Sequence, residues 1–311
     1  MKNKRIFALF SAVMLMLTGC AGSTEESALQ AENSPAETAA PVEKKLSTLG
    51  DSISYGLGME DIDTQRYSAI LKQHLEELDG VTWLDYNYAL SGDDSSDLLH
   101  NLQNGRAMRL PSSDIIVMCI GANNLLGVYT DYAIEKADEY DIDPANITED
   151  DLAEIQEKFE AETADPEALQ AEFQRRIDEN LVRLESDLGG IYDWIRERNP
   201  DAPFYVLNVY NPYTPETDAG MMGDAAEFYG FAVSNLDRLN TIIKDFTDAH
   251  DDLIFVDIAA AFAECDEPPV LGYTAYDSGQ AGEMKYYDPH PNAEGQKLIA
   301  ETVWKVMEQH P

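Results

Sequence analysis

Residues 46–56, LSTLGDSISYG, join a short apolar run to a serine that stands between an acid and an isoleucine, with glycines close by on both sides. This run is the first of five stretches rich in branched and aromatic residues. The other four are 81–90 (VTWLDYNYAL), 113–121 (SDIIVMCIG), 202–210 (APFYVLNVY) and 252–262 (DLIFVDIAAAF). Helical patterns separate them, and strands that alternate with helices predict an α/β domain with a five-stranded parallel sheet covered on both faces.

Apolar residues recur at helical spacing in three segments, around 173–194, 236–246 and 298–307. Between the third strand and the first of these helices lies a long acidic connection, 127–171. We predict that this insert is helical, with Thr148 as a helix N-cap, and that it forms a lid or rim over the site. A calcium loop is excluded in the insert, because Asn146 and Leu152 occupy the positions of the turn glycine and the bidentate glutamate.

The N-terminal residues have the features of an export signal. A cationic start, Lys2–Arg5, precedes the apolar run 6–17, which is short for a membrane span. The run ends in Leu17-Thr18-Gly19-Cys20, which resembles the lipobox of bacterial lipoproteins and implies lipidation at Cys20. The alternatives are an ordinary cleaved signal and an uncleaved anchor.

The domain organisation follows from composition. We predict a signal peptide at 1–20, a disordered tether at 21–45 that is poor in large apolar residues, and one folded domain at 46–311. The expected location is outside the cytoplasm, with the membrane contacted only through the lipid.

The formal net charge of −38 argues against binding to nucleic acid or anionic head groups. We expect a monomer. Besides Cys20 the chain has two cysteines, Cys119 in an apolar run and Cys265, and both a disulfide between them and two free thiols are compatible with the sequence. The cysteines lack the paired spacing of a zinc site.

Ser52 follows the first predicted strand directly. In a parallel sheet, such a residue lies at the carboxyl edge, where these folds bind ligands, so Ser52 is a candidate nucleophile. The alternative is a helix cap in a glycine-rich turn. The sequence has no Gly-x-Ser-x-Gly elbow around Ser52, which is unlike an ordinary α/β-hydrolase.

Among the five histidines, His290 is the candidate base, because it stands in YYDPHPNAEG just before the last predicted helix. Prolines follow both Asp288 and His290 and favour extended backbone at each, so the two side chains are expected on the same side. Asp288 is therefore the candidate for the acid that orients the imidazole. Alternatively or in addition, this loop is a rigid start of the helix, with Asn292 as its cap.

An ester-cleaving serine also needs donors for the developing oxyanion. Gly92, after the second strand, offers an unobstructed backbone N–H. Asn123, after the third strand, offers a side-chain amide.

The order of these blocks, Ser52, Gly92, Gly121-x-Asn123 and Asp288-x-His290, resembles the SGNH or GDSL hydrolase superfamily. The resemblance extends over about 46–306. It implies a flavodoxin-like three-layer α/β/α sandwich, with Ser52 as nucleophile and His290 as base. Gly92, Asn123 and the Ser52 backbone N–H would then form the oxyanion hole.

Three positions depart from the family pattern. Ile53 replaces the leucine of the family name, Asn124 stands where an aspartate usually follows the asparagine, and Tyr287 occupies the usual position of the acid, three residues before the histidine.

The expected function is a serine esterase or lipase that forms an acyl-enzyme at Ser52 without a metal or organic cofactor. Its substrate is expected to be a small-molecule, glycan or lipid ester. Two alternatives remain open: a lipid-anchored solute- or glycan-binding protein on this fold, and an O-acyltransferase that uses the same acyl-enzyme.

Overall fold

The computed structural model describes residues 42–140, 158, 166–217, 225–277 and 283–310. Five parallel strands form the central sheet in the order β2-β1-β3-β4-β5, as in flavodoxin-like folds. The strands are β1 (Glu43–Gly50), β2 (Thr82–Asn87), β3 (Ile115–Cys119), β4 (Phe204–Leu207) and β5 (Leu253–Val256). The predicted five-stranded parallel sheet is thus confirmed.

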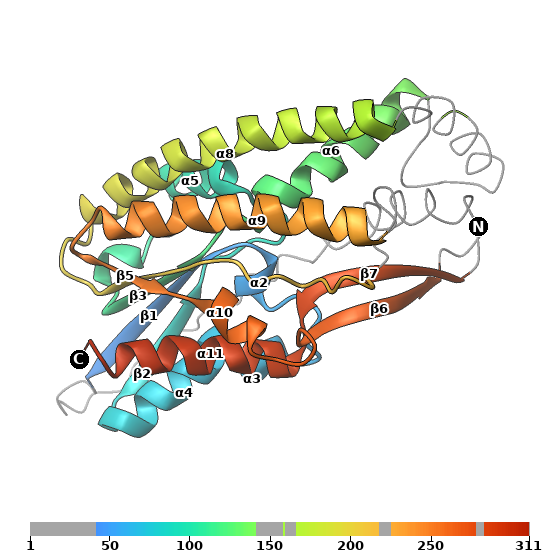
Figure 1. The fold of residues 1–311 in the computed structure, drawn as a ribbon. Coiled ribbons are helices and arrows are strands. Elements are labelled where there is room, and N and C mark those ends of the chain that lie inside the picture. Colours follow the sequence, from blue (N-terminus) through green and yellow to red (C-terminus); the bar gives the residue numbers. More distant parts are fainter. Residues whose placement is uncertain (1–41, 141–157, 159–165, 218–224, 278–282, 311) are drawn as a thin grey trace.

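Helices cover both faces of this sheet (Figure 1). One face carries α5 (Ser95–Gln103), α6 (Ala122–Glu139), α8 (Pro166–Arg196) and α9 (Ala225–Asp248), and the other carries α4 (Tyr67–Asp79), α10 (Ile258–Ala263) and α11 (Ala293–Met307). The short helices α2 (Ser52–Tyr55) and α3 (Ile62–Gln65) follow β1, and a 3₁₀ turn spans Leu110–Ser112. The three-layer α/β/α sandwich is therefore confirmed.

Strands β3 and β4 are apolar because both of their faces are buried. In β3, Ile116 and Met118 point into the core beneath α6 and α8, while Val117 and Cys119 point into the core beneath α4 and α11. Side chains alternate between faces with period two, so a fully covered strand is apolar at every position. This explains why the strand runs were easy to recognise in the sequence.

A two-stranded antiparallel hairpin, β6 (Val270–Asp277) and β7 (Glu283–Pro291), was not predicted. Its second strand contains Pro289 and ends at Pro291, and prolines are typical of loops or sheet edges. The segment around His290, interpreted as a loop, is therefore the end of a strand. Asn292 caps α11 as predicted, because its Oδ1 accepts the N–H of Gly295 at 3.0 Å.

Two predicted boundaries differ from the structure. Strand β1 begins at Glu43, so the end of the predicted tether, 43–45, belongs to the sheet. In the fifth run, the strand stops at Val256 and the remainder forms α10, capped by Asp257. Helix α6 and the start of α8 occupy the two ends of the predicted insert. The signal peptide with Cys20, most of the tether and the Thr148 cap lie outside the described residues.

The two cysteines in the described residues, Cys119 and Cys265, are free. Cys119 is buried between β3 and the α4–α11 layer, consistent with a core role. Within the ranges described, no helix is both long and apolar enough to cross a membrane.

Candidate active site

Strand β1 delivers Ser52 to the carboxyl edge of the sheet through a tight turn. Gly50 has φ 140°, and a Cβ there would lie 2.0 Å from the carbonyl oxygen of Cys119, so only glycine fits. Asp51 then caps α2, its Oδ1 accepting the backbone N–H of Ile53 at 2.9 Å. Ser52 is the first residue of α2, and its backbone N–H consequently has no acceptor within the helix.

Two amide side chains hold this four-residue helix from outside. Gln296 of α11, which is fully buried, donates its Nε2–H to the carbonyl of Ile53 at 3.0 Å and accepts the N–H of Tyr67 at 2.9 Å. Asn87 at the end of β2 donates its Nδ2–H to the carbonyl of Ser54 at 2.7 Å. Helix α2 is too short to be stable alone, so its position depends on these contacts.

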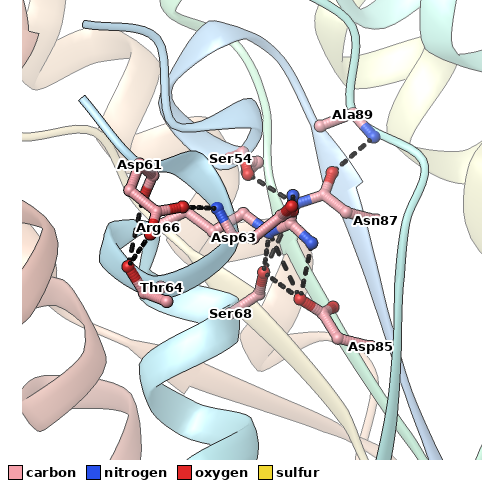
Figure 2. Close-up of polar contacts among 9 residues, drawn as sticks. All are labelled: Ser54, Asp61, Asp63, Thr64, Arg66, Ser68, Asp85, Asn87 and Ala89. Carbon is pink, nitrogen blue, oxygen red and sulfur yellow. Dashed lines mark hydrogen bonds and ion pairs between the residues drawn. The ribbon is translucent and has the colours of Figure 1, made fainter. Parts of the chain in front are cut away.

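Asn87 is itself part of a polar network beneath α2 (Figure 2). Arg66 donates to Asp85 Oδ2 at 3.0 Å, and Ser68 donates to the same oxygen at 2.9 Å. Asn87 reaches Ser68 at 3.3 Å, while its Oδ1 accepts the N–H of Ala89 at 3.0 Å. The network joins the ends of β2 and α3 to the helix that carries Ser52.

His290 reaches the same edge from β7. The β6–β7 ladder shifts register between Val270 and Gly272, so that one residue of β6 faces the two residues Pro289 and His290. Such a bulge redirects side chains and is common next to active sites. Asp288, just before it, accepts from both the backbone N–H of His290 at 3.0 Å and the ring Nδ1 at 2.6 Å through one oxygen, Oδ1.

The imidazole faces the serine directly. His290 Nε2 lies 2.8 Å from Ser52 Oγ, although the two residues are 238 positions apart in sequence. With Nδ1 engaged by Asp288, the proton on the ring lies on Nδ1, and Nε2 is free to accept from the hydroxyl. The structure thus brings together Ser52, His290 and Asp288 in the order hydroxyl, imidazole, carboxylate.

Gly92 and Asn123 border the same cleft as Ser52. Strand β1 lies between β2 and β3 in the sheet, so the loops after these two strands flank Ser52. Gly92 has φ 92°, which favours glycine. Asn123 Nδ2 donates to the carbonyl of Asp93 at 2.9 Å, and because a primary amide has two N–H groups, a second one remains for a ligand.

Asn124 joins these two flanking loops. It is fully buried, accepts the N–H of Ser95 at 3.2 Å and donates to Ser95 Oγ at 2.9 Å. Its own carbonyl accepts from Asn180 of α8 at 3.0 Å. The start of α6, which carries Asn123, is therefore fixed to the start of α5, close to Gly92.

Two buried carboxyls next to the site have raised pKa values. Burial is the main cause for both: it raises the pKa of Asp51 to about 7 and that of Asp93 to about 6. Asp51 Oδ2 has no hydrogen-bond partner in the described part of the protein. At neutral pH a substantial fraction of Asp51 is consequently protonated.

A largely apolar cleft opens beside Ser52, with about 1080 Å³ of empty space including its mouth. It passes between α6 and α9 and reaches α8. Its apolar lining comes mainly from Leu126, Tyr129, Ile177, Phe228, Phe231 and Leu236. Of the five histidines only His290 contributes to it. In the described segments, no group of three or more histidine, cysteine or acidic side chains is arranged to hold a metal ion.

Several residues of the site were not singled out from the sequence. The sequence could have identified Asp51, since an acid before a short helix is a usual N-cap. It could not have identified Asn87 and Gln296, because their partners are distant in sequence and amides are common in loops and helices. The sixth sequence candidate, Cys20, lies outside the described residues.

Comparison with known proteins agrees with this geometry. Residues 48–298 match the model of the GDSL-like lipase/acylhydrolase family. The chain belongs to this family. No curated protein is a significant match to the GDSL hydrolase chain.

Solved structures of other hydrolases share its fold. An extracellular lipase from Streptomyces rimosus is 17% identical, with a TM-score of 0.54 over 86% of this chain and 99% of that one. A phospholipase A1 from Streptomyces albidoflavus NA297 is 18% identical, with a TM-score of 0.53 over 86% and 98%. An acetylxylan esterase from Geobacillus stearothermophilus, solved as a catalytic mutant, is 14% identical, with a TM-score of 0.51 over 85% and 94%. Membership in the family makes the chain an ester-bond hydrolase.

The structure accounts for two departures from the GDSL pattern. Asn124 uses both its oxygen and its nitrogen on Ser95, which an aspartate could match only in part. Tyr287 donates its hydroxyl to the carbonyl of Pro212 at 2.6 Å, away from His290, whose ring instead contacts Asp288.

Proposed function

We propose that this GDSL hydrolase cleaves carboxylic esters through an acyl-enzyme at Ser52. The supporting observation is that Ser52 Oγ lies 2.8 Å from His290 Nε2, while the other ring nitrogen, Nδ1, lies 2.6 Å from Asp288 Oδ1. In the first step, His290 takes the hydroxyl proton while Oγ bonds to the ester carbonyl carbon. The imidazolium then protonates the leaving alcohol, and the bond from carbon to that oxygen breaks.

The oxyanion of each tetrahedral intermediate would accept hydrogen bonds from the backbone N–H groups of Ser52 and Gly92 and from Asn123 Nδ2. Asp288 would keep the proton of the neutral imidazole on Nδ1 and stabilise the imidazolium. In the second half-reaction, His290 deprotonates a water molecule that attacks the acyl carbon, and the proton returns to Ser52 Oγ. This releases the carboxylic acid.

The cleft favours an acyl group longer than acetyl. Leucines, aromatic rings and Ile177 make up most of its wall, and burial of a methylene in such surroundings contributes about 0.8 kcal/mol. The solved relatives include both lipases and an acetylxylan esterase, so they do not decide between long and short acyl groups. The apolar wall supports a substrate with a fatty acyl chain.

We also propose that the enzyme acts outside the cytoplasm, attached to the membrane by a lipid on Cys20. The support is the sequence alone: the cationic start, the apolar run 6–17 and the lipobox-like Leu17–Cys20. Expression of the full chain in a bacterium fed a radiolabelled or alkyne-tagged fatty acid tests it. Wild-type protein should carry the label and Cys20→Ser should not; an unlabelled wild-type protein rejects the anchor.

A fluorophosphonate probe and a set of aryl esters test the reaction. The wild-type protein should become labelled on the peptide that contains Ser52 and should hydrolyse the esters, whereas Ser52→Ala should do neither. Ser234→Ala, on the exposed side of α9, is the matched control and should retain both activities. Labelling elsewhere, or hydrolysis by Ser52→Ala, rejects Ser52 as the nucleophile.

The same preparation separates the alternatives. A binding protein on this fold would leave the probe unreacted. An acyltransferase would react, but product analysis would find the acyl group on an added glycan acceptor in preference to water.

A further inference from the structure

Two tyrosine hydroxyls join the catalytic end of β7 to the loop that follows β4. Tyr210 donates to the carbonyl of Pro289 at 2.8 Å, and Tyr287 donates to the carbonyl of Pro212 at 2.6 Å. Each segment thus supplies one hydroxyl and one carbonyl. We propose that Tyr210 and Tyr287 are positioning residues, which fix the Asp288–His290 segment against the wall of the cleft. This inference rests on the proposed function.

Because of the bulge in the hairpin, the Asp288–His290 segment needs hydrogen bonds from outside the β6–β7 ladder. Opposite Pro289 and His290 the β6–β7 pairing loses its register, so the ladder does not hold these two residues. Pro289 has no N–H, and the N–H of His290 is bound by Asp288 within the same segment. The carbonyls of Pro289 and His290 are therefore the backbone groups of these two residues that can bind the rest of the fold, and Tyr210 binds that of Pro289.

Tyr210 is itself held rigidly. It is 3% exposed, and its ring stacks on Phe262 of α10 with the centroids 4.1 Å apart and the planes 17° apart. Burial raises the pKa of Tyr210 well above its ordinary value, so the hydroxyl stays protonated and acts as a donor. The bond to Pro289 thus links the peptide just before His290 to the core of the domain.

The Tyr287 hydroxyl makes the second of the two hydrogen bonds, from β7 to the loop that follows β4. Its ring lies between Tyr213 and Tyr273, with centroid distances of 5.6 and 5.2 Å. The residues from Val209 to Tyr213 border the cleft, and Pro212 is among them. The two hydrogen bonds therefore make the imidazole and one wall of the cleft move together.

Loss of one of these two tyrosine hydrogen bonds should change the orientation of His290 more than it changes the binding of substrate. A small displacement of a catalytic group can lower the rate by up to about 100-fold. For Tyr210→Phe we expect kcat to fall between about 10-fold and about 100-fold. KM should stay within about 2-fold, because the ring that borders the cleft is retained.

The experiment compares Tyr210→Phe with wild-type enzyme on an aryl acetate and an aryl octanoate. Tyr192→Phe is the matched control, since the Tyr192 hydroxyl donates to Asp252 at 3.0 Å on the surface, away from the cleft. A positioning role predicts the same loss of kcat on both esters, a proportionally slower reaction of Ser52 with the fluorophosphonate, and an unchanged control. Thermal melting confirms that the variants are folded.

Two results would overturn the proposal. Unchanged kcat on both esters would mean that the tie does not position His290, and a loss restricted to the octanoate would make Tyr210 only a part of the acyl-binding wall. If Tyr210→Phe does not fold, Tyr287→Phe, which removes the reciprocal bond from outside the cleft, decides by the same criteria. Failure of the wild-type enzyme to hydrolyse either ester would instead reject the proposed function.

Discussion

Asp288 Oδ1 accepts two hydrogen bonds from the same residue, one from the backbone N–H of His290 at 3.0 Å and one from its ring Nδ1 at 2.6 Å. These two hydrogen bonds fix both the backbone and the ring of His290, and Asp288 makes them from only two positions before the histidine. This short spacing between acid and histidine is possible because the backbone is extended at the bulge. Tyr287, three residues before the histidine, binds the carbonyl of Pro212 instead.

Asp288→Asn should lower kcat by about a thousandfold or more, because an amide can present its N–H to Nδ1 and favour the wrong tautomer of the imidazole. Steady-state hydrolysis of an aryl ester measures the loss. Asp252→Asn is the control, because Asp252 stands just before β5, away from the cleft, where its partly exposed carboxylate pairs with Arg196, and it should be near wild type. Retention of more than about a tenth of the activity would show that Asp288 is not the orienting acid.

Asn123→Ala should reduce kcat by about 100-fold to 1000-fold with a smaller change in KM, because the amide is expected to bind the oxyanion more strongly than the ground-state carbonyl. Asn104→Ala removes a comparable amide, which donates to the carbonyl of His100 at 2.8 Å on the surface, and should leave the kinetics unchanged. Equal kinetics for the two variants would exclude Asn123 from the oxyanion hole.

The buried carboxyl of Asp51 should make the protein less stable as the pH rises. Its pKa of about 7 in the folded state lies above its ordinary value of 3.8, so between these values the folded protein retains a proton that the unfolded chain has lost. Stability is therefore lost as the pH increases through this window, by roughly 4 kcal/mol in total for this group.

Asp51→Asn removes that titration and keeps an oxygen for the N–H of Ile53. Urea unfolding near pH 5 and near pH 8 should show a smaller decrease in the free energy of unfolding for the variant than for the wild type. A residual slope is expected from Asp93, whose pKa is about 6. Identical pH dependence in both proteins would contradict the raised pKa of Asp51.

Gln296→Met should destabilise the fold by about 2–5 kcal/mol, because the carbonyl of Ile53 and the N–H of Tyr67 would lose their buried partner. Gln73→Met is the control on an exposed face of α4, where the amide only contacts Glu77. Urea unfolding measures both variants, and a loss no larger than that of the control would show that Gln296 does not support α2.

On the proposal that the apolar cleft binds the acyl chain, Ala232→Trp should shift the preference of the enzyme from long-chain to short-chain esters. Ala232 borders the cleft from α9, and an indole there would fill the space for the acyl chain while leaving Ser52 accessible. We expect kcat/KM for an aryl octanoate to fall by more than about 10-fold, with little change for the acetate. Ser234→Trp, on the exposed side of α9, is the control; parallel loss on both esters would place the acyl chain elsewhere.

The sequence could predict the features that depend on local pattern. Apolar and aromatic runs identified all five strands without knowledge of their neighbours, because most of their side chains are buried or half-buried between the two helical layers. The loops after the strands of a parallel sheet lie at one edge, which made Ser52, Gly92 and Asn123 candidates, and the resemblance of their order to the GDSL pattern then selected them. Prolines after Asp288 and His290 restricted the backbone enough to predict extended residues with their side chains near each other.

Tertiary structure alone decided how these parts meet. The 2.8 Å contact of Ser52 with His290, the support of α2 by Asn87 and Gln296, and the hydroxyl ties of Tyr210 and Tyr287 join residues that are far apart in the chain. The hairpin was hidden because antiparallel pairing at an edge tolerates prolines and leaves no apolar run. The periodicity of apolar residues indicates which face of a helix or strand is buried. A hydrogen bond between residues far apart in the chain depends instead on where packing places both backbones, and no local sequence pattern predicts that.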